Sequence, residues 1–319
     1  MVRPRTRIPA AMPAATTAIL PSVTSAVALG VGLALIAAAA FAGGASAALV
    51  SLGHRPRQVL LSLTGGVLLG VGMLHLLPHA CLELGGNMDA AAGWALGGFF
   101  LMFLLERAFH AHAHHAVDEG CGHDHGADGR TATAPHHHHG TSRGRWAWCG
   151  ALAGLTLHSL ADGAALAASV RADALHGAGL FAGFATFLAI LLHKPLDAGI
   201  IATLMVESGV PPRWRTVVNA AYAAVVPIGA AAFLVSLPFA RGREDAVLGI
   251  ALALAAGAFI CIAAADLLPE VQFHSHDRVL LTTALVMGLA IAWGMTMLER
   301  SSHGHASHGH GPAAAVPRP

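Results

Sequence analysis

The chain has 319 residues, of which 55% are hydrophobic and only 11% are charged. Soluble globular domains carry about 25% charged residues, so this composition argues strongly against a water-soluble enzyme. The net charge is +1 with histidine neutral, so the chain has no excess of basic residues that would suggest nucleic acid as a partner. Aromatic residues make up only 6%, and the mixture of Ala, Leu, Val and Gly is typical of membrane helices that pack closely.

Apolar runs long enough to cross a bilayer recur eight times, and each is bounded by charge, histidine or Gly/Pro clusters. We therefore predict an all-α, polytopic membrane protein with eight transmembrane helices. The predicted spans are residues 23–52, 58–81, 91–109, 146–170, 177–206, 216–240, 246–268 and 279–298. The first run is much longer than the apolar region of a signal peptide, which has about 7–15 residues, so an uncleaved helix is expected.

Histidine is unusually frequent, with 22 copies. The segment 110–145 has almost no apolar residues and cannot form a packed core, so we expect a disordered loop. Neutral imidazole is a ready ligand for borderline divalent ions, which predicts metal capture here and in the similar tail 303–310. The alternatives are a neutral linker or, at 136–139, a tag. The ten loop histidines are His110, His112, His114, His115, His123, His125, His136, His137, His138 and His139.

Two parts of the chain resemble each other. Gly66 precedes HLLPHA at 75–80, and Gly257 precedes DLLPEV at 266–271 at the same offset. The following spans end in LLERAFHAH at 104–112 and MLERSSHGH at 297–305. Because an odd number of spans separates equivalent helices, the two three-helix units are expected to be inverted in a 3+2+3 arrangement, as in many secondary transporters.

This pattern divides the chain into five parts. They are a first three-helix repeat with its N-terminal tail (1–109), the His-rich loop (110–145), a two-helix metal-binding core (146–206), a second three-helix repeat (207–300) and a His-rich C-terminal tail (301–319).

The two central spans carry the same polar pattern. His158 and Asp162 are four residues apart in the fourth span, and His193 and Asp197 repeat this spacing in the fifth. Residues at this spacing share one helix face. A charged residue in mid-membrane costs at least about 2.5 kcal/mol, and a divalent ion bound by imidazole and carboxylate would compensate. We therefore predict a metal site rather than structural hydrogen bonding, with a kink at Pro195 that exposes a backbone oxygen nearby.

These motifs resemble those of the ZIP family of divalent-metal transporters. HSLADG at 158–163 is similar to the fourth-helix element H-[NS]-x-x-[ED]-G. HKPLDA at 193–198 is similar to the fifth-helix H-x-x-P-E-G, with the proline one place earlier and Ala in place of Gly. HLLPHA and DLLPEV resemble its second- and seventh-helix L-P-E elements. The resemblance implies that His158, Asp162, His193 and Asp197 form the primary transport site, that both termini lie outside, and that the His-rich loop is cytoplasmic.

The sequence also departs from family members that have a binuclear site. At the positions of the second-site ligands it has Ser159, Lys194 and Val226. Lys194 is the only lysine of the chain. We predict a single-metal site in which Lys194 supplies the missing positive charge. The alternative, a lysine that reaches the membrane interface, is weaker because the position is deep.

The repeated ends of the second and seventh spans suggest cation relay positions at the pore mouths. An equally good reading is that these polar residues are helix termini that meet water. The residues concerned are His75, His79, Asp266 and Glu270, with Glu83 nearby.

The predicted function is transport of divalent metal ions toward the cytoplasm, not catalysis. Two imidazoles with carboxylates suit Zn²⁺ as substrate, with Fe²⁺, Mn²⁺, Co²⁺ and Cd²⁺ as further candidates, and no resident cofactor is expected. The expected partners are metal ions and the lipid bilayer, with a homodimer as a candidate assembly. Arginine-rich, alanine-rich usage favours a bacterial origin and hence the inner membrane.

Two other functions fit the sequence less well. A cation diffusion facilitator usually has six spans and a soluble C-terminal domain, whereas only residues 299–319 follow the last predicted span. An intramembrane zinc hydrolase would need a nucleophile or substrate motif, and the sequence contains nothing that resembles one.

Overall fold

The computed structural model describes residues 23–47, 54–110, 147–176, 181–273 and 278–304. Within these ranges the chain is helical and contains no strand, as expected for an all-α protein. The elements are α1 (Val23–Ala47), α2 (His54–Val71), the π-helical turn η1 (Gly72–Leu76), α3 (Leu77–Glu83), α4 (Met88–His110), α5 (Ala147–Leu175), α6 (Phe184–Glu207), α7 (Pro212–Ala223), α8 (Val225–Ser236), the 3₁₀ turn η5 (Leu237–Ala240), α9 (Glu244–Phe273) and α10 (Arg278–Gly304).

The prediction of eight membrane spans is confirmed for the described part of the chain. Eight helical segments there are long and apolar enough to cross a bilayer. They cover Val23–Ser46, Arg55–Glu83, Met88–Arg107, Trp148–Leu175, Phe184–Glu207, Pro212–Ala240, Glu244–Ala265 and Arg278–Leu298. The fifth begins at Phe184 rather than at residue 177, because Gly183 has φ 75° and the helix can start only after this left-handed residue.

Two of the spans change helical geometry beside a proline. Pro227 has no N–H for the carbonyl of Ala223, the last residue of α7, and the same span resumes as α8. The second span passes through the π-helical turn Gly72–Leu76 just before Pro78. By contrast, α6 continues through Pro195 as one helix, so the kink expected at Pro195 does not interrupt the helix.

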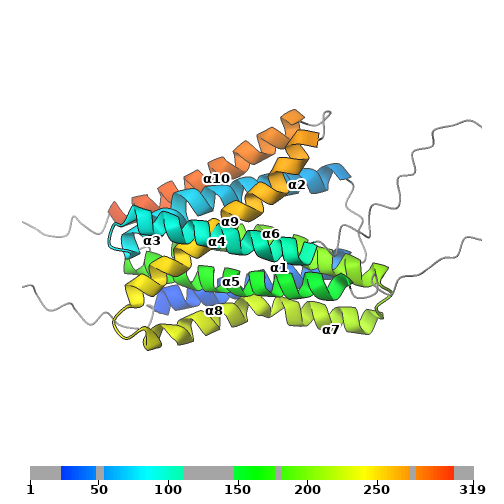
Figure 1. Cartoon of the computed structure of the whole chain (residues 1–319), viewed down its shortest axis with the longest axis horizontal. Coiled ribbons are helices and arrows are strands. Elements are labelled where there is room, and N and C mark those ends of the chain that lie inside the picture. Colours follow the sequence, from blue (N-terminus) through cyan, green and yellow to red (C-terminus); the bar gives the residue numbers. More distant parts are fainter. Residues whose placement is uncertain (1–22, 48–53, 111–146, 177–180, 274–277, 305–319) are drawn as a thin grey trace, which may run out of the picture.

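The helices form a bundle along the long axis of the molecule, which α9 crosses obliquely (Figure 1). We call the end where α3 gives way to α4 the turn end, on the left in Figure 1, and the end where α4 stops and α5 starts the loop end, on the right. The main packing partners are α2 with α10, α4 with α9, α1 with α6, and α5 with α8.

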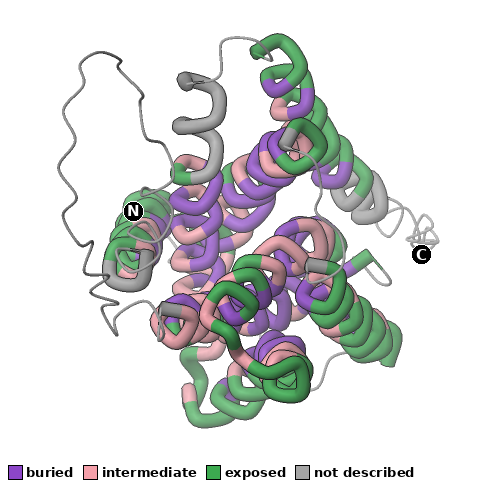
Figure 2. Tube along the Cα trace, turned by 90° about the vertical axis from the view of Figure 1, so that its right-hand side faces the viewer, coloured by how far each residue is buried: buried purple, intermediate pink, exposed green. Residues whose placement is uncertain are grey.

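Burial follows the expectation for a bundle in lipid. Figure 2 shows buried segments facing the interior, while the outer faces of the peripheral helices are exposed. Large apolar side chains such as Leu96, Leu101 and Val235 lie on these outer faces. So much exposed apolar surface fits contact with lipid rather than with water.

Glycines allow three of the helix pairs to approach closely. A Cβ atom on any of them would overlap the backbone of the opposing helix. The pairs are Gly66 with Gly288 (α2 and α10), Gly98 with Gly257 (α4 and α9), and Gly163 with Gly229 (α5 and α8). Small residues at such interfaces are a general device of membrane helix packing.

Gly163 gives a direct test of this packing, because it lies one residue after Asp162. In Gly163→Ala the new methyl group would meet backbone atoms of Val226 and Ala230, so we expect a loss of roughly 1–3 kcal/mol of stability. The thermal unfolding midpoint of the purified protein in detergent should fall. The matched control is Gly93→Ala, whose methyl group meets nothing within 4 Å. Equal midpoints for the two variants would contradict this packing.

Candidate metal centre

Two helices bring the four polar residues of the central spans together. Asp162 Oδ2 lies 3.2 Å from His158 Nε2 and 3.3 Å from His193 Nε2. The ligand atoms of these three buried residues all lie within 4.8 Å of one another, a group able to hold a metal ion. Asp197 Oδ2 is 3.7 Å from His158 Nε2, and its side chain is only 15% exposed. Two imidazoles and two carboxylates therefore face one small region between α5 and α6.

The orientation of His193 suits metal binding. Its Nδ1 lies 2.8 Å from the carbonyl oxygen of Ala189. A carbonyl oxygen only accepts, so Nδ1 donates to it, and Nε2 is the ring nitrogen that faces Asp162 and could bind a metal ion. A hydrogen bond of this kind to the other ring nitrogen is the usual way in which proteins orient a histidine ligand.

Lys194 lies between the two carboxylates. Its side chain is fully buried, and Nζ is 2.5 Å from Asp162 Oδ2 and 2.8 Å from Asp197 Oδ2. Nζ also donates to Ser159 Oγ at 3.1 Å. With neutral histidines the two carboxylates and this ammonium leave a net charge of −1. Val226 is buried on α8 beside Gly163 and offers no side-chain ligand.

Tyr222 on α7 completes the polar group, and the sequence analysis did not find it. Ser159 Oγ donates to the tyrosine hydroxyl at 2.9 Å, and that hydroxyl donates to Asp197 Oδ2 at 3.5 Å. Tyr222 is the only tyrosine in the chain and is buried. A lone phenol in an apolar span was the available signal, because a buried hydroxyl needs a hydrogen-bond partner.

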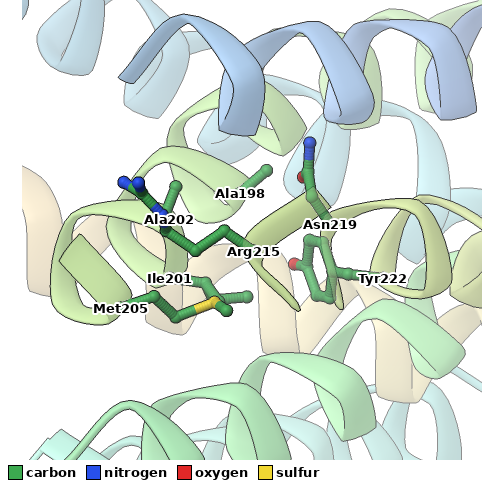
Figure 3. A pocket seen from close by; sticks show the side chains of 7 residues that line it. All are labelled: Ala198, Ile201, Ala202, Met205, Arg215, Asn219 and Tyr222. Atoms are coloured by element: carbon green, nitrogen blue, oxygen red, sulfur yellow. The ribbon is translucent and has the colours of Figure 1, made fainter. Parts of the chain in front are cut away.

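A small hollow adjoins the tyrosine on the loop-end side of Asp197. Figure 3 shows the side chains around it, which come from α6 and α7. They are Ala198, Ile201, Ala202, Met205, Arg215, Asn219 and Tyr222. The Asn219 amide donates to the carbonyl of Phe41 on α1 at 2.8 Å. The hollow thus lies next to the candidate metal centre, toward the loop end.

The structure describes the side chains of only two of the four predicted pore-mouth residues. His75 and His79 lie near the turn end and approach Asp173, a residue not predicted from the sequence. Asp266 and Glu270 belong to α9, but their side chains lie outside the described part of the structure. The same holds for His110 at the end of α4, and the loop histidines from His112 to His139 lie outside the described residues.

The chain is similar to known zinc transporters. The family described as ZIP zinc transporter matches residues 19–297. A zebrafish (Danio rerio) protein, "Zinc transporter ZIP1", is 25% identical over 270 residues, which is 73% of this chain and 82% of the relative. These matches favour a transporter over the alternatives of a cation diffusion facilitator or an intramembrane hydrolase. Since the family match spans nearly the whole chain, this protein belongs to the ZIP zinc transporter family, whose members are metal-ion transporters and not enzymes.

Proposed function

We propose that the protein carries divalent metal ions, with zinc as the principal substrate, through one site formed by His158, Asp162, His193 and Asp197. The convergence of these four groups in the interior of the bundle is the observation that carries the proposal. Nitrogen and carboxylate ligands at one buried point suit Zn²⁺. Fe²⁺, Mn²⁺, Co²⁺ and Cd²⁺ share enough of this chemistry to be tested as competitors for zinc flux.

Lys194 limits the site to one ion in this proposal. Its ammonium neutralises one of the two carboxylate charges, so one Zn²⁺ changes the net charge of the group from −1 to +1. A second divalent ion next to the first would be repelled by that ion and by the ammonium. No further anionic ligand would offset this repulsion, since Ser159 and Val226 provide none. The lysine therefore takes the place of a second metal.

Anomalous diffraction at the zinc edge tests this count. Crystals of the full-length protein grown with zinc should give one peak among His158, Asp162, His193 and Asp197. The ammonium of Lys194 should remain in contact with the carboxylates. Two peaks bridged by the carboxylates would contradict a single-metal site.

Alternating access would follow from inverted repeats on either side of α5 and α6. In the sequence repeat, α2 corresponds to α9 and α4 corresponds to α10. The α2–α10 interface is therefore the counterpart of the α9–α4 interface, and both are among the main helix contacts of the bundle. Each of these interfaces contains a close glycine pair, Gly66 with Gly288 and Gly257 with Gly98. This correspondence supports the 3+2+3 arrangement, in which the α5–α6 core moves between the repeats.

We further propose that transport runs toward the cytoplasm across the inner membrane, with both termini outside. The small hollow beside Tyr222 supports release toward the loop end, where α4 stops and α5 starts (Figure 3). The loop histidines would then receive the ion on the cytoplasmic side.

A further inference from the structure

A second group of metal-ligating side chains lies near the turn end. His75 Nε2 is 3.6 Å from Asp173 Oδ2, and His79 Nε2 is 3.5 Å from Asp173 Oδ1. The three ligand atoms lie within 4.8 Å of one another. His75 and Asp173 are almost completely buried, with side-chain exposures of 1% and 2%, and His79 is 19% exposed. Each carboxylate oxygen thus faces one imidazole.

The two histidines come from a stretch of altered helical geometry. His75 lies in the π-helical turn Gly72–Leu76, and His79 follows in α3 immediately after Pro78. Their ring centroids are 4.7 Å apart, so both imidazoles lie on the same side of the span. Single π-helical turns inside α-helices occur frequently at functional sites.

The carboxylate and one imidazole are held by neighbours that are not themselves ligands. The backbone N–H of Gly183 donates to Asp173 Oδ2 at 2.6 Å. Ser169 Oγ lies 3.1 Å from His75 Nε2 and accepts a 2.8 Å hydrogen bond from Thr186 Oγ1. These contacts hold the side chains of Asp173 and His75 in place without an ion. Ser169 contacts Nε2, the same ring nitrogen that faces Asp173, so a bound ion would take the place of this hydrogen bond.

This group is separate from the primary centre. Asp173 follows Asp162 by eleven residues in the same helix, which corresponds to about 16 Å along the axis at 1.5 Å per residue. Leu166 on α5 and Ala189 and Ile190 on α6 occupy intermediate positions and are fully buried. An apolar layer thus lies between the two groups, and one ion cannot bind both.

Polar side chains continue from this group toward the turn end. The rings of His79 and His176 have centroids 5.7 Å apart, and His176 Nδ1 is 3.9 Å from Glu83 Oε1. The His176 side chain is 38% exposed. An ion arriving at that end would therefore meet imidazole and carboxylate groups on its way inward.

We propose that His75, His79 and Asp173 form a second divalent-metal site, which holds Zn²⁺ at the turn end before the ion passes to the primary centre. Two imidazoles and one carboxylate leave a fourth position of a tetrahedral zinc ion open to water, an arrangement that permits exchange. Mg²⁺ and Ca²⁺ prefer oxygen ligands and fit this donor set less well. The order of the two sites rests on the proposed direction of transport, but binding at the second site does not.

Zinc-edge anomalous diffraction of the full-length protein, compared with Asp162→Asn, tests binding. We expect a peak among His75, His79 and Asp173 in both proteins, while the peak at the primary centre disappears in the variant. Absence of the turn-end peak from both proteins overturns the second site. If no ion appears at the primary centre of the unmodified protein but the turn-end peak is present, the proposed function fails and the second site stands.

Transport kinetics test whether the second site takes part in zinc transport. His79→Ala removes one ligand from a partly exposed position, so little of the packing is lost, and the KM for zinc should rise at least about tenfold. The maximal flux at saturating zinc should change much less. Asp89→Asn is the matched control, because this exposed acid lies at the same end of the bundle, and its KM should equal that of the unmodified protein. An unchanged KM in His79→Ala overturns a role of the second site in transport.

Discussion

Replacing Asp162 by asparagine is expected to remove high-affinity zinc binding at the primary centre. One oxygen of this carboxylate lies within 3.3 Å of both imidazole nitrogens and also contacts Lys194. Asparagine has nearly the same shape, so the change removes mainly the negative charge. The group would then have a net charge of zero in place of −1, and we expect the affinity for Zn²⁺ to fall at least about a hundredfold.

Competition with a chromophoric zinc chelator measures this affinity on the purified full-length protein. The loop histidines are the same in both proteins, so the difference reports on the membrane centre. Asp89→Asn is again the control, since it removes a carboxylate from the exposed start of α4. Equal affinities of Asp162→Asn and the unmodified protein would exclude Asp162 as a zinc ligand.

Replacing Lys194 by methionine is expected to have the opposite effect, with tighter zinc binding and slower transport. The ammonium lies 2.5 Å and 2.8 Å from the two carboxylates, so its removal leaves a buried net charge of −2. At an effective dielectric constant near 20, two unit charges about 4 Å apart interact with an energy of about 4 kcal/mol. Removing the repulsion between the ammonium and a bound zinc ion should therefore raise the zinc affinity at least about tenfold. Flux should fall, because zinc is released more slowly.

The same variant should be less stable without zinc. Removing one partner of a buried ion pair typically costs about 3–5 kcal/mol, because the other charge remains buried and uncompensated. Zinc would restore the lost charge, so the rise of the unfolding midpoint on zinc addition should be larger than in the unmodified protein. Ser159→Ala is the control, because it removes a hydrogen bond to Lys194 without changing any charge. A zinc affinity in Lys194→Met equal to or below that of the unmodified protein would show that the ammonium does not act as a built-in cation.

The sequence predicted the features that repeat within single helices. Long apolar runs located all eight spans, because lipid requires continuous apolar helices. The pairs His158 with Asp162 and His193 with Asp197 could be found because residues four apart share a helix face. The predicted start of the fifth span was wrong, since residues 177–183 are apolar enough for membrane but contain the left-handed Gly183.

Features that depend on packing between helices could not be predicted from patterns within single helices. Asp173 lies beyond residue 170, where the fourth span was predicted to end, and its histidine partners are 98 and 94 residues earlier in the chain. Tyr222 reaches Ser159 and Asp197 only because α7 lies against α6. These contacts depend on how whole helices pack against one another, which no local pattern of the sequence encodes.

The central claim is that zinc crosses the membrane through the His158, Asp162, His193 and Asp197 centre. Flux of radiolabelled zinc into proteoliposomes tests it most directly, with the unmodified protein, Asp162→Asn and Asp89→Asn reconstituted side by side at equal density. The account predicts saturable flux in the unmodified protein and in Asp89→Asn, and flux at the level of empty liposomes in Asp162→Asn. Equal saturable flux in all three proteins, or none in the unmodified protein, would contradict it.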